Sequence, residues 1–232
     1  MSCILYIETA TSVCSVAVSK DGEVIFQKEE TTGPSHAQVL GSFVKEAVDE
    51  LQKKNLKPDA VAVSCGPGSY TGLRIGVSEA KGLCYGWNIP LIAIETLTIM
   101  AAGVVRRRLV GDDVLLCPMI DARRMEVYDA IFDSQLTKLK EVSADIIDEN
   151  SFAEYLSANK VVFFGDGSDK CKSALTHVNA SFLDSVYPHA EDMVALAEEA
   201  FANKSFVDVA YFEPFYLKEF VATTPKNKVL GT

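Results

Sequence analysis

The stretch Gly66-Pro67-Gly68-Ser69-Tyr70-Thr71-Gly72-Leu73-Arg74 decides how this chain is organised. It follows a short apolar segment, 59–65, with the composition of a buried strand, and it precedes a segment, 73–87, with the pattern of a helix. Glycines and a proline between a strand and a helix let the backbone approach a ligand or another chain closely. The sequence therefore predicts a site of close approach at the start of this helix.

Spacing excludes two familiar phosphate-binding loops. A P-loop needs a Lys-Ser/Thr pair where this chain has Thr71 or Leu73, and the dinucleotide fingerprint needs a glycine at position 71. Ser69 and Thr71 remain as candidate N-caps of the helix. Because a cation in the first turn opposes the helix dipole, we expect an anion beside Arg74. A carboxylate of the chain is favoured over a ligand.

The composition limits the classes of protein to which the chain can belong. Its 232 residues are 48% hydrophobic, which suits one large domain or two small lobes, and its net charge of -10 argues against this chain alone wrapping a phosphate backbone. No basic segment precedes the first apolar run, and no apolar run reads as a membrane span, so we expect a cytoplasmic protein without a membrane segment. The six cysteines lack Cys-x-x-Cys spacing and are expected to be buried. The three histidines lack metal-site spacing, and we expect no metal site.

Outward from the glycine stretch, the hydrophobic pattern predicts the same plan twice. In the first half the predicted strands are 4–8, 13–19, 23–29, 59–65 and 90–94, and the predicted helices are 35–54, 73–87 and 96–108. Ser35 with Gln38 forms a capping box for the first helix, and Thr96 is expected to cap the third. In the second half the predicted strands are 114–121, 126–133, 136–142 and 161–164, and the predicted helices are 151–158 and 190–203. Two lobes, 1–109 and 110–232, follow, with the helix at 190–203 free to pack back on the first lobe.

This duplicated order is the plan of the actin-like ATPase and RNase H-like folds, an α/β class with a mixed sheet and flanking helices in each lobe. Such proteins carry an acidic residue at the end of the first strand of each lobe, and Glu8 and Asp121 occupy those positions. The turns that follow, 9–12 and 122–124, contain no glycine, so they form phosphate-binding backbone nests poorly. Their sequence weighs against an efficient ATPase. Arg123 is a candidate contact for an anion.

Segments spread along the chain resemble the bacterial TsaB family, also called YeaZ. They are 7–11 with 14–17, 66–76, 120–123 with 126–128, 190–193 and 213–217. The match covers nearly the whole chain in order, and its glycine motif is specific. Glu8 is a departure, since the family usually has Asp there, and a longer side chain would shift any bound metal.

The resemblance implies the two-lobed actin-like fold and a role in making N6-threonylcarbamoyladenosine at position 37 of tRNAs that read codons starting with A. It implies that the paralogous TsaD performs the transfer, that TsaB-like proteins bind and activate it, and that the ATPase TsaE joins them. TsaD carries a His-x-x-x-His metal motif, whereas here His36 is followed by Leu40. A non-catalytic, metal-free subunit is therefore expected, which reaches tRNA only through the complex. A homodimer is expected when the chain is alone, and ATP or ADP at the partner interface stays an open alternative.

The resemblance also places the partner contact on the first two long helices. The residues expected there are Leu40, Phe43, Val44, Gly72, Leu73, Gly76, Val77 and Ala80. The candidate anion or nucleotide contacts are Glu8, Ser69, Thr71, Arg74, Asp121 and Arg123. Two enzymatic alternatives stay open: a sugar-kinase-like ATPase or phosphotransferase in the interlobe cleft, and a peptidase with Ser69 or Thr71 as nucleophile.

Overall fold

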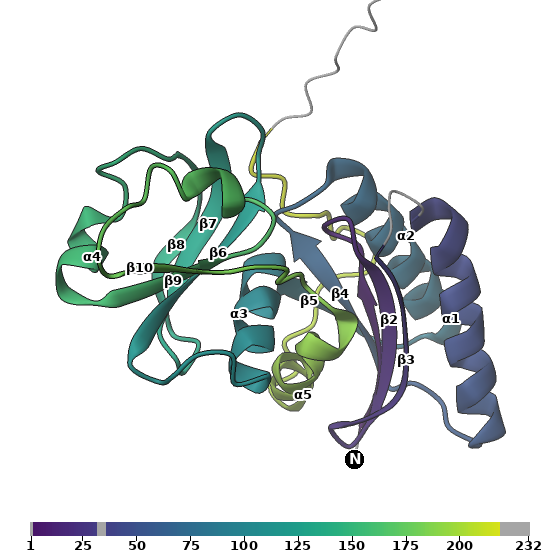
Figure 1. The fold of residues 1–232 in the computed structure, drawn as a ribbon. Coiled ribbons are helices and arrows are strands. Elements are labelled where there is room, and N and C mark those ends of the chain that lie inside the picture. The colour runs from purple at the N-terminus through teal and green to yellow at the C-terminus, as the bar shows by residue number, and fades with distance from the viewer. Residues whose placement is uncertain (1, 32–35, 219–232) are drawn as a thin grey trace, which may run out of the picture.

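The computed structural model of the chain describes residues 2–31 and 36–218, and it contains two five-stranded sheets (Figure 1). The first sheet has the order β3-β2-β1-β4-β5, with β1 Cys3–Glu8, β2 Cys14–Lys20, β3 Glu23–Glu30, β4 Ala60–Gly66 and β5 Leu91–Glu95. The second has the order β10-β9-β6-β7-β8, with β6 Val114–Asp121, β7 Glu126–Phe132, β8 Lys138–Ile146, β9 Lys160–Phe164 and β10 Ala180–Leu183.

The two sheets follow one plan. In each, the first strand pairs antiparallel with the second and parallel with the fourth, and the fourth pairs parallel with the fifth. The predicted α/β fold of the actin-like type, with a mixed sheet and flanking helices in each lobe, is thereby confirmed.

The first sheet is apolar on both faces because helices cover both of them. Leu5 and Ile7 of β1 face the helices α1 His36–Lys53 and α2 Tyr70–Trp87, which lie side by side (Figure 1). Ile4 and Tyr6 face the opposite side, where the 3₁₀ turn η2 Ala190–Met193 and the helix α5 Val194–Ala202 pack. A strand buried on both faces loses the alternation of polar and apolar residues, which explains the continuous apolar run at the N-terminus.

Helix α3 Thr96–Arg106 lies between the two sheets (Figure 1). Ile99 packs against the first sheet, whereas Leu97, Met100 and Val104 join the core of the second. Because one helix serves both cores, the division of the chain at residue 109 stays a prediction. The second lobe has shorter helical elements, namely α4 Ala153–Ala158 and the 3₁₀ turn η1 Asp169–Cys171.

Several local expectations need correction or lie outside the described residues. Thr96 does not cap α3, because it is the first helical residue and its buried hydroxyl has no partner. The predicted helix at 190–203 is a 3₁₀ turn followed by a short α-helix, and it packs on the first sheet. The proposed cap Ser35 and the tail after Val221 lie outside the described residues.

Two of the three arginines at the end of α3 form ion pairs with the segment after β10. Arg106 and Arg107 pair with the buried carboxylate of Asp192 at 2.8 and 3.2 Å. Arg106 also pairs with Glu191 at 2.6 Å. These ion pairs fasten η2 to α3.

All six cysteines are buried and free, as predicted. Within the described residues, no helix combines the length and the apolar character that spanning a membrane requires.

Candidate functional site

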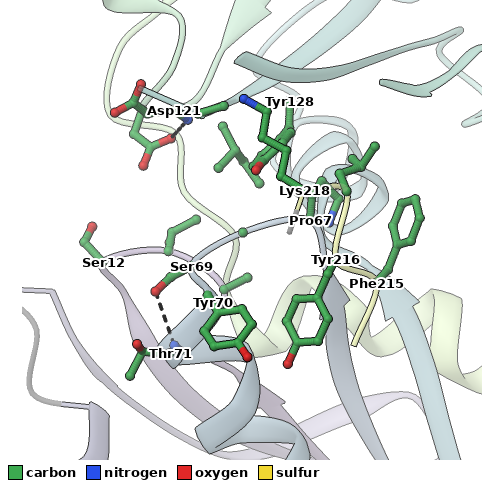
Figure 2. Close-up of a pocket in the computed structure, with 18 of the residues that line it drawn as sticks. Ser12, Pro67, Ser69, Tyr70, Thr71, Asp121, Tyr128, Phe215, Tyr216 and Lys218 are labelled. Atoms are coloured by element: carbon green, nitrogen blue, oxygen red, sulfur yellow. Dashed lines mark hydrogen bonds between the residues drawn. The ribbon is translucent and has the colours of Figure 1, made fainter. Parts of the chain in front are cut away.

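A cavity of about 750 Å³ lies between the two sheets (Figure 2). The segments that line it include the turn after β1, the starts of α1 and α2, the turn between β6 and β7, Asp166 after β9, and residues 215–218. The cavity therefore occupies the interlobe position that the fold class predicts for a ligand.

The glycine stretch joins the C-terminal segment to this cavity. The backbone N–H of Phe215 donates to the carbonyl of Cys65 at 2.7 Å. Gly66 has φ of 114°, and a Cβ there would lie 2.6 Å from the carbonyl oxygen of Phe215. Only glycine fits this approach, because a side chain would both strain the backbone and displace residue 215.

Ser69 is the N-cap of α2. Its hydroxyl accepts a hydrogen bond from the backbone N–H of Gly72 at 3.2 Å, and its own N–H donates to the carbonyl of Ala10 at 2.7 Å. Thr71 lies within the first turn, is exposed and lines the cavity. Of the two hydroxyls predicted to cap the helix, Ser69 does so and Thr71 does not.

The predicted close approach involves the turn after β1 of the same chain. A Cβ at Gly72 would overlap the carbonyl oxygen of Thr9, and a Cβ at Gly76 would overlap the Thr9 hydroxyl. The same hydroxyl donates to the carbonyl of Gly72 at 2.8 Å. The glycines at positions 72 and 76 of α2 are therefore explained by packing inside the chain.

This packing bears on the predicted partner contact. All eight residues expected at a partner surface are buried within the chain itself: Leu40, Phe43, Val44, Gly72, Leu73, Gly76, Val77 and Ala80. Packing between the helices and their own sheet accounts for this burial, and the partner contact at these residues stays a prediction.

The expected anion beside Arg74 is absent among the described residues, where no carboxylate lies within ion-pair distance of this guanidinium. Instead the guanidinium lies 5.4 Å from the centroid of the Tyr70 ring and donates to the Tyr70 hydroxyl at 3.3 Å. Arg74 is exposed and does not line the cavity. Its cation–π contact stabilises it where an ion pair was expected.

Glu8 is also absent from the cavity lining. Its side chain is fully buried, and one carboxylate oxygen accepts from the N–H of Ala10 at 2.6 Å and from the hydroxyl of Ser64 at 2.9 Å. The other carboxylate oxygen is buried without a hydrogen-bond partner. Burial raises the pKa of Glu8 to about 7, although these hydrogen bonds oppose the rise. Glu8 is therefore sealed from this cavity, and the anion contact proposed at Glu8 stays a prediction.

The second acidic residue does reach the cavity. Asp121 is half-exposed, its carboxylate accepts from the N–H of Arg123 at 3.0 Å and pairs with Lys170, and its own N–H donates to Asp166 at 3.0 Å. Arg123 and Arg124 have φ of 73° and 53°, in the left-handed region that a phosphate-binding turn usually fills with glycine.

The residues present do not fit a magnesium–nucleotide complex of the kind found in actin-like ATPases. Glu8 is buried, and its carboxylate accepts a hydrogen bond from the turn that would meet the phosphates. The N–H of Ala10 is already occupied, and its carbonyl is held by Ser69. The peptidase alternative also loses support, because the Ser69 hydroxyl serves as a helix cap and His36 Nε2 lies 2.7 Å from the Thr11 carbonyl.

Sequence reasoning missed the aromatic wall of the cavity. Tyr70 and Tyr216 have ring centroids 4.8 Å apart, Phe215 lies beside Tyr216, and Tyr128 and Lys218 line the cavity at the other end of the view (Figure 2). The place of residues 215–218 in the cavity had no sequence signal, since it depends on a contact between positions about 150 residues apart.

Comparison with known proteins gives consistent results along the chain. A family model described as "TsaD: tRNA N6-adenosine threonylcarbamoyltransferase" matches residues 27–226. The protein named tRNA threonylcarbamoyladenosine biosynthesis protein TsaB from Escherichia coli is 33% identical, with 94% of this chain and 96% of that protein covered. The protein of the same name from Bacillus subtilis is 27% identical over 93% of each.

Solved structures agree with this match. YeaZ from Pseudomonas aeruginosa has a TM-score of 0.79 and 28% identity, with 94% of this chain and 100% of that chain covered. A second Pseudomonas aeruginosa structure, described as similar to peptidase YEAZ, has a TM-score of 0.81, 27% identity and the same coverage. The glycine stretch, the duplicated sheets and these similarities together show that the chain belongs to the TsaB (YeaZ) family.

Proposed function

We propose that this chain is a non-catalytic subunit that binds and activates a TsaD-type transferase in the formation of threonylcarbamoyladenosine in tRNA. The relatives of this chain are named for this pathway, and the match to the family model supports the proposal. In this proposal a TsaE-type ATPase joins the pair, and tRNA is reached through the assembly.

The observation that best supports binding to a second protein is a row of small residues on the outer side of α2. Ser78, Gly82 and Gly86 are spaced four residues apart and are all exposed. Apart from the adjoining residues and backbone of α2 itself, no heavy atom of the described residues lies within 4 Å of a Cβ built at Gly82 or Gly86. An interior helix glycine costs about 1 kcal/mol relative to alanine, and the described part of the chain provides no contact at these positions that offsets the cost. Close packing of a helix from a second protein would offset it.

The surroundings of this row of small residues suit a protein partner. Gly41 on the neighbouring helix α1 is likewise exposed, with no heavy atom within 4 Å of a Cβ built there. At the end of α2, Tyr85 is 86% exposed and Trp87 is 36% exposed. Large exposed aromatic residues beside small ones are typical of protein interfaces. We define the α1–α2 outer surface as Gly41, Ser78, Gly82, Tyr85 and Gly86, and we propose that it also forms the homodimer when the partner is absent.

The state of Glu8 supports a non-catalytic role. In an actin-like ATPase this position helps to organise the metal and the phosphates, whereas here its carboxylate bonds to Ala10 and Ser64 and is sealed from the cavity. The chemistry is therefore assigned to the partner.

Reconstitution of tRNA modification tests the activator role. Product formation is measured with the TsaD-type and TsaE-type proteins of the same organism, with and without this chain. We expect modification to fall to background when the chain is omitted. Unchanged modification would exclude the activator role.

A steric variant tests the surface itself. Gly82→Leu should abolish co-purification with the transferase while leaving the unfolding temperature close to that of the wild type, because open space surrounds this position. Ala195→Leu, at an exposed position of α5, is the matched control and should bind normally. Equal binding by both variants would place the interface elsewhere.

The alternative function is a sugar-kinase-like ATPase or phosphotransferase. It is supported by the cavity between the sheets, which lies where such enzymes hold their nucleotide. Calorimetric titration of the isolated chain with ATP and Mg²⁺ decides between the two functions. Tight binding with turnover would favour the enzyme. Binding that occurs only in the presence of the transferase would favour a nucleotide at the partner interface.

A further inference from the structure

An aromatic and cationic platform at the cavity has no role in the function proposed above. Tyr70 and Tyr216 form a tilted pair at 4.8 Å, both rings partly exposed, and Phe215 beside them is 42% exposed (Figure 2). The guanidinium of Arg74, which is not part of the cavity lining, lies against the Tyr70 ring of this pair. We call Arg74, Tyr70, Tyr216 and Arg123 the platform.

Two cations of the platform are available to an anion. Neither Arg74 nor Arg123 has a carboxylate within ion-pair distance among residues 2–31 and 36–218, and both are exposed. The neighbouring cations differ, since Lys218 pairs with Glu126 and Lys170 pairs with Asp121.

Hydrogen-bonding groups complete the lining. The exposed residues Ser12 and Thr71 also line the cavity, with Thr71 beside Tyr70, and Asp121 lies near the top of the view (Figure 2). A volume of about 750 Å³ falls within the range of small-molecule pockets and accepts one nucleotide rather than a duplex.

This combination matches the chemistry of an unpaired nucleotide. Proteins recognise single-stranded RNA by stacking splayed bases on tyrosine rings and arginine planes, and by hydrogen bonds to the base edges and ribose. The acidic character of the chain excludes a long contact with a phosphate backbone, but it leaves room for one nucleotide held by stacking and by one or two cations.

We infer that the platform binds one unpaired nucleotide of the tRNA substrate, with its base stacked on Tyr216 and its phosphate near Arg123. The inference rests on the proposed function, because the transferase complex is what brings tRNA to this chain. Since the same chemistry would accept a free mononucleotide, the experiment has to separate the two sources.

Photo-crosslinking tests the contact directly. The full chain, in complex with the TsaD-type protein, is irradiated with an anticodon stem–loop RNA that carries 4-thiouridine in its loop, and the crosslinked peptides are identified by mass spectrometry. We expect crosslinks on the peptides that contain Tyr70 and Tyr216, and we expect a fully paired RNA hairpin to give none. Crosslinks confined to other peptides would overturn the inference. Competition by AMP as effectively as by the stem–loop would also overturn it, since the site would then be a mononucleotide site.

Variants separate this contact from partner binding. Tyr216→Ala should raise the KM for tRNA about tenfold, because base–aromatic stacking has roughly that weight, and Tyr216→Phe should restore it. Tyr211→Ala is the control, since Tyr211 is 86% exposed and does not line the cavity. Arg123→Asn is a second variant, because asparagine tolerates the positive φ at this position. It should raise the KM as well.

Co-purification with the transferase is measured for each variant. Normal partner binding with a raised KM supports the nucleotide contact. Loss of partner binding by Tyr216→Ala in a folded protein would make the platform a protein interface and overturn the inference. If the wild-type chain fails to activate the transferase, the proposed function fails, and the crosslinking result still decides the RNA contact by itself.

Discussion

The hydroxyl of Thr9 donates to the carbonyl of Gly72 at 2.8 Å, and no Cβ fits between the two residues. This contact joins the turn after the first strand to the first turn of α2. In nucleotide-binding relatives of the fold the corresponding turn meets phosphate, whereas here it meets the chain's own helix. The glycine motif is therefore a packing motif.

Gly76→Ala should destabilise the fold, since its Cβ would overlap the Thr9 hydroxyl. We expect a loss of about 2–3 kcal/mol in the free energy of unfolding, measured by urea denaturation, as for other overpacked core sites. The control is Gly82→Ala in the same helix, where a Cβ meets open space and the protein should gain up to about 1 kcal/mol. Equal effects of the two changes would show that Thr9 moves aside.

Ser69→Ala should cost about 1 kcal/mol of stability, because the N–H of Gly72 loses its capping oxygen. Thr71→Ala, two residues further on, removes an exposed hydroxyl that makes no cap and should change the free energy of unfolding by less than about 0.5 kcal/mol. Thermal unfolding of both variants at one pH gives the comparison. A larger loss at Thr71 would contradict the assigned cap.

Glu8 should make stability depend on pH. Burial raises its pKa in the folded protein to about 7, from an ordinary value of 4.5, so the folded state binds the proton more tightly than the unfolded state. The contribution of Glu8 is fully present below the ordinary value and is lost as pH rises through about 7, by up to about 3 kcal/mol. Glu8→Gln cannot titrate, so its free energy of unfolding should fall less across this window.

Asp129 serves as the reference for this measurement. Burial raises its pKa to about 6 despite the contact with Lys140 at 2.6 Å, so it contributes a slope of the same sign in both proteins. Identical pH profiles for the wild type and Glu8→Gln would show that Glu8 does not titrate in this window.

Asp192→Asn should loosen the attachment of η2 to α3. The change leaves Arg106 and Arg107 without their shared buried carboxylate, but both arginines are partly exposed. We therefore expect a loss of about 2 kcal/mol, below the roughly 3–5 kcal/mol of a fully buried pair. Glu191→Gln affects only the outer contact of Arg106 and should cost less than about 1 kcal/mol. Chemical denaturation of both variants tests the difference.

Much of the fold could be predicted because periodicity is a local property. The predicted strands at 4–8 and 114–121 and the helix at 35–54 correspond to β1, β6 and α1, with ends displaced by no more than one residue where the structure describes them. Repetition of the element order then indicated the duplicated architecture. The helix at 190–203 was predicted less well: its first turn is a 3₁₀ turn, and Asp192 in that turn is paired with an arginine of a helix distant in sequence.

The site could be predicted only in part. Ser69, Thr71, Asp121 and Arg123 do line the cavity, because each follows a strand or begins a helix at the edge where the sheets meet. Glu8 and Arg74 do not, since the direction of a side chain depends on which neighbours accept its hydrogen bonds or its charge.

The sequence by itself determined the fold class, the family and the need for close packing at Gly72 and Gly76. Glycine spacing and hydrophobic periodicity are local properties, so they can be recognised from residues that are close together in the chain. Only the tertiary structure decided what those glycines touch. It assigned them to Thr9 of the same chain and brought Tyr216 against Tyr70. Such contacts join residues far apart in the chain, and they form only when the two sheets and the C-terminal segment are packed together.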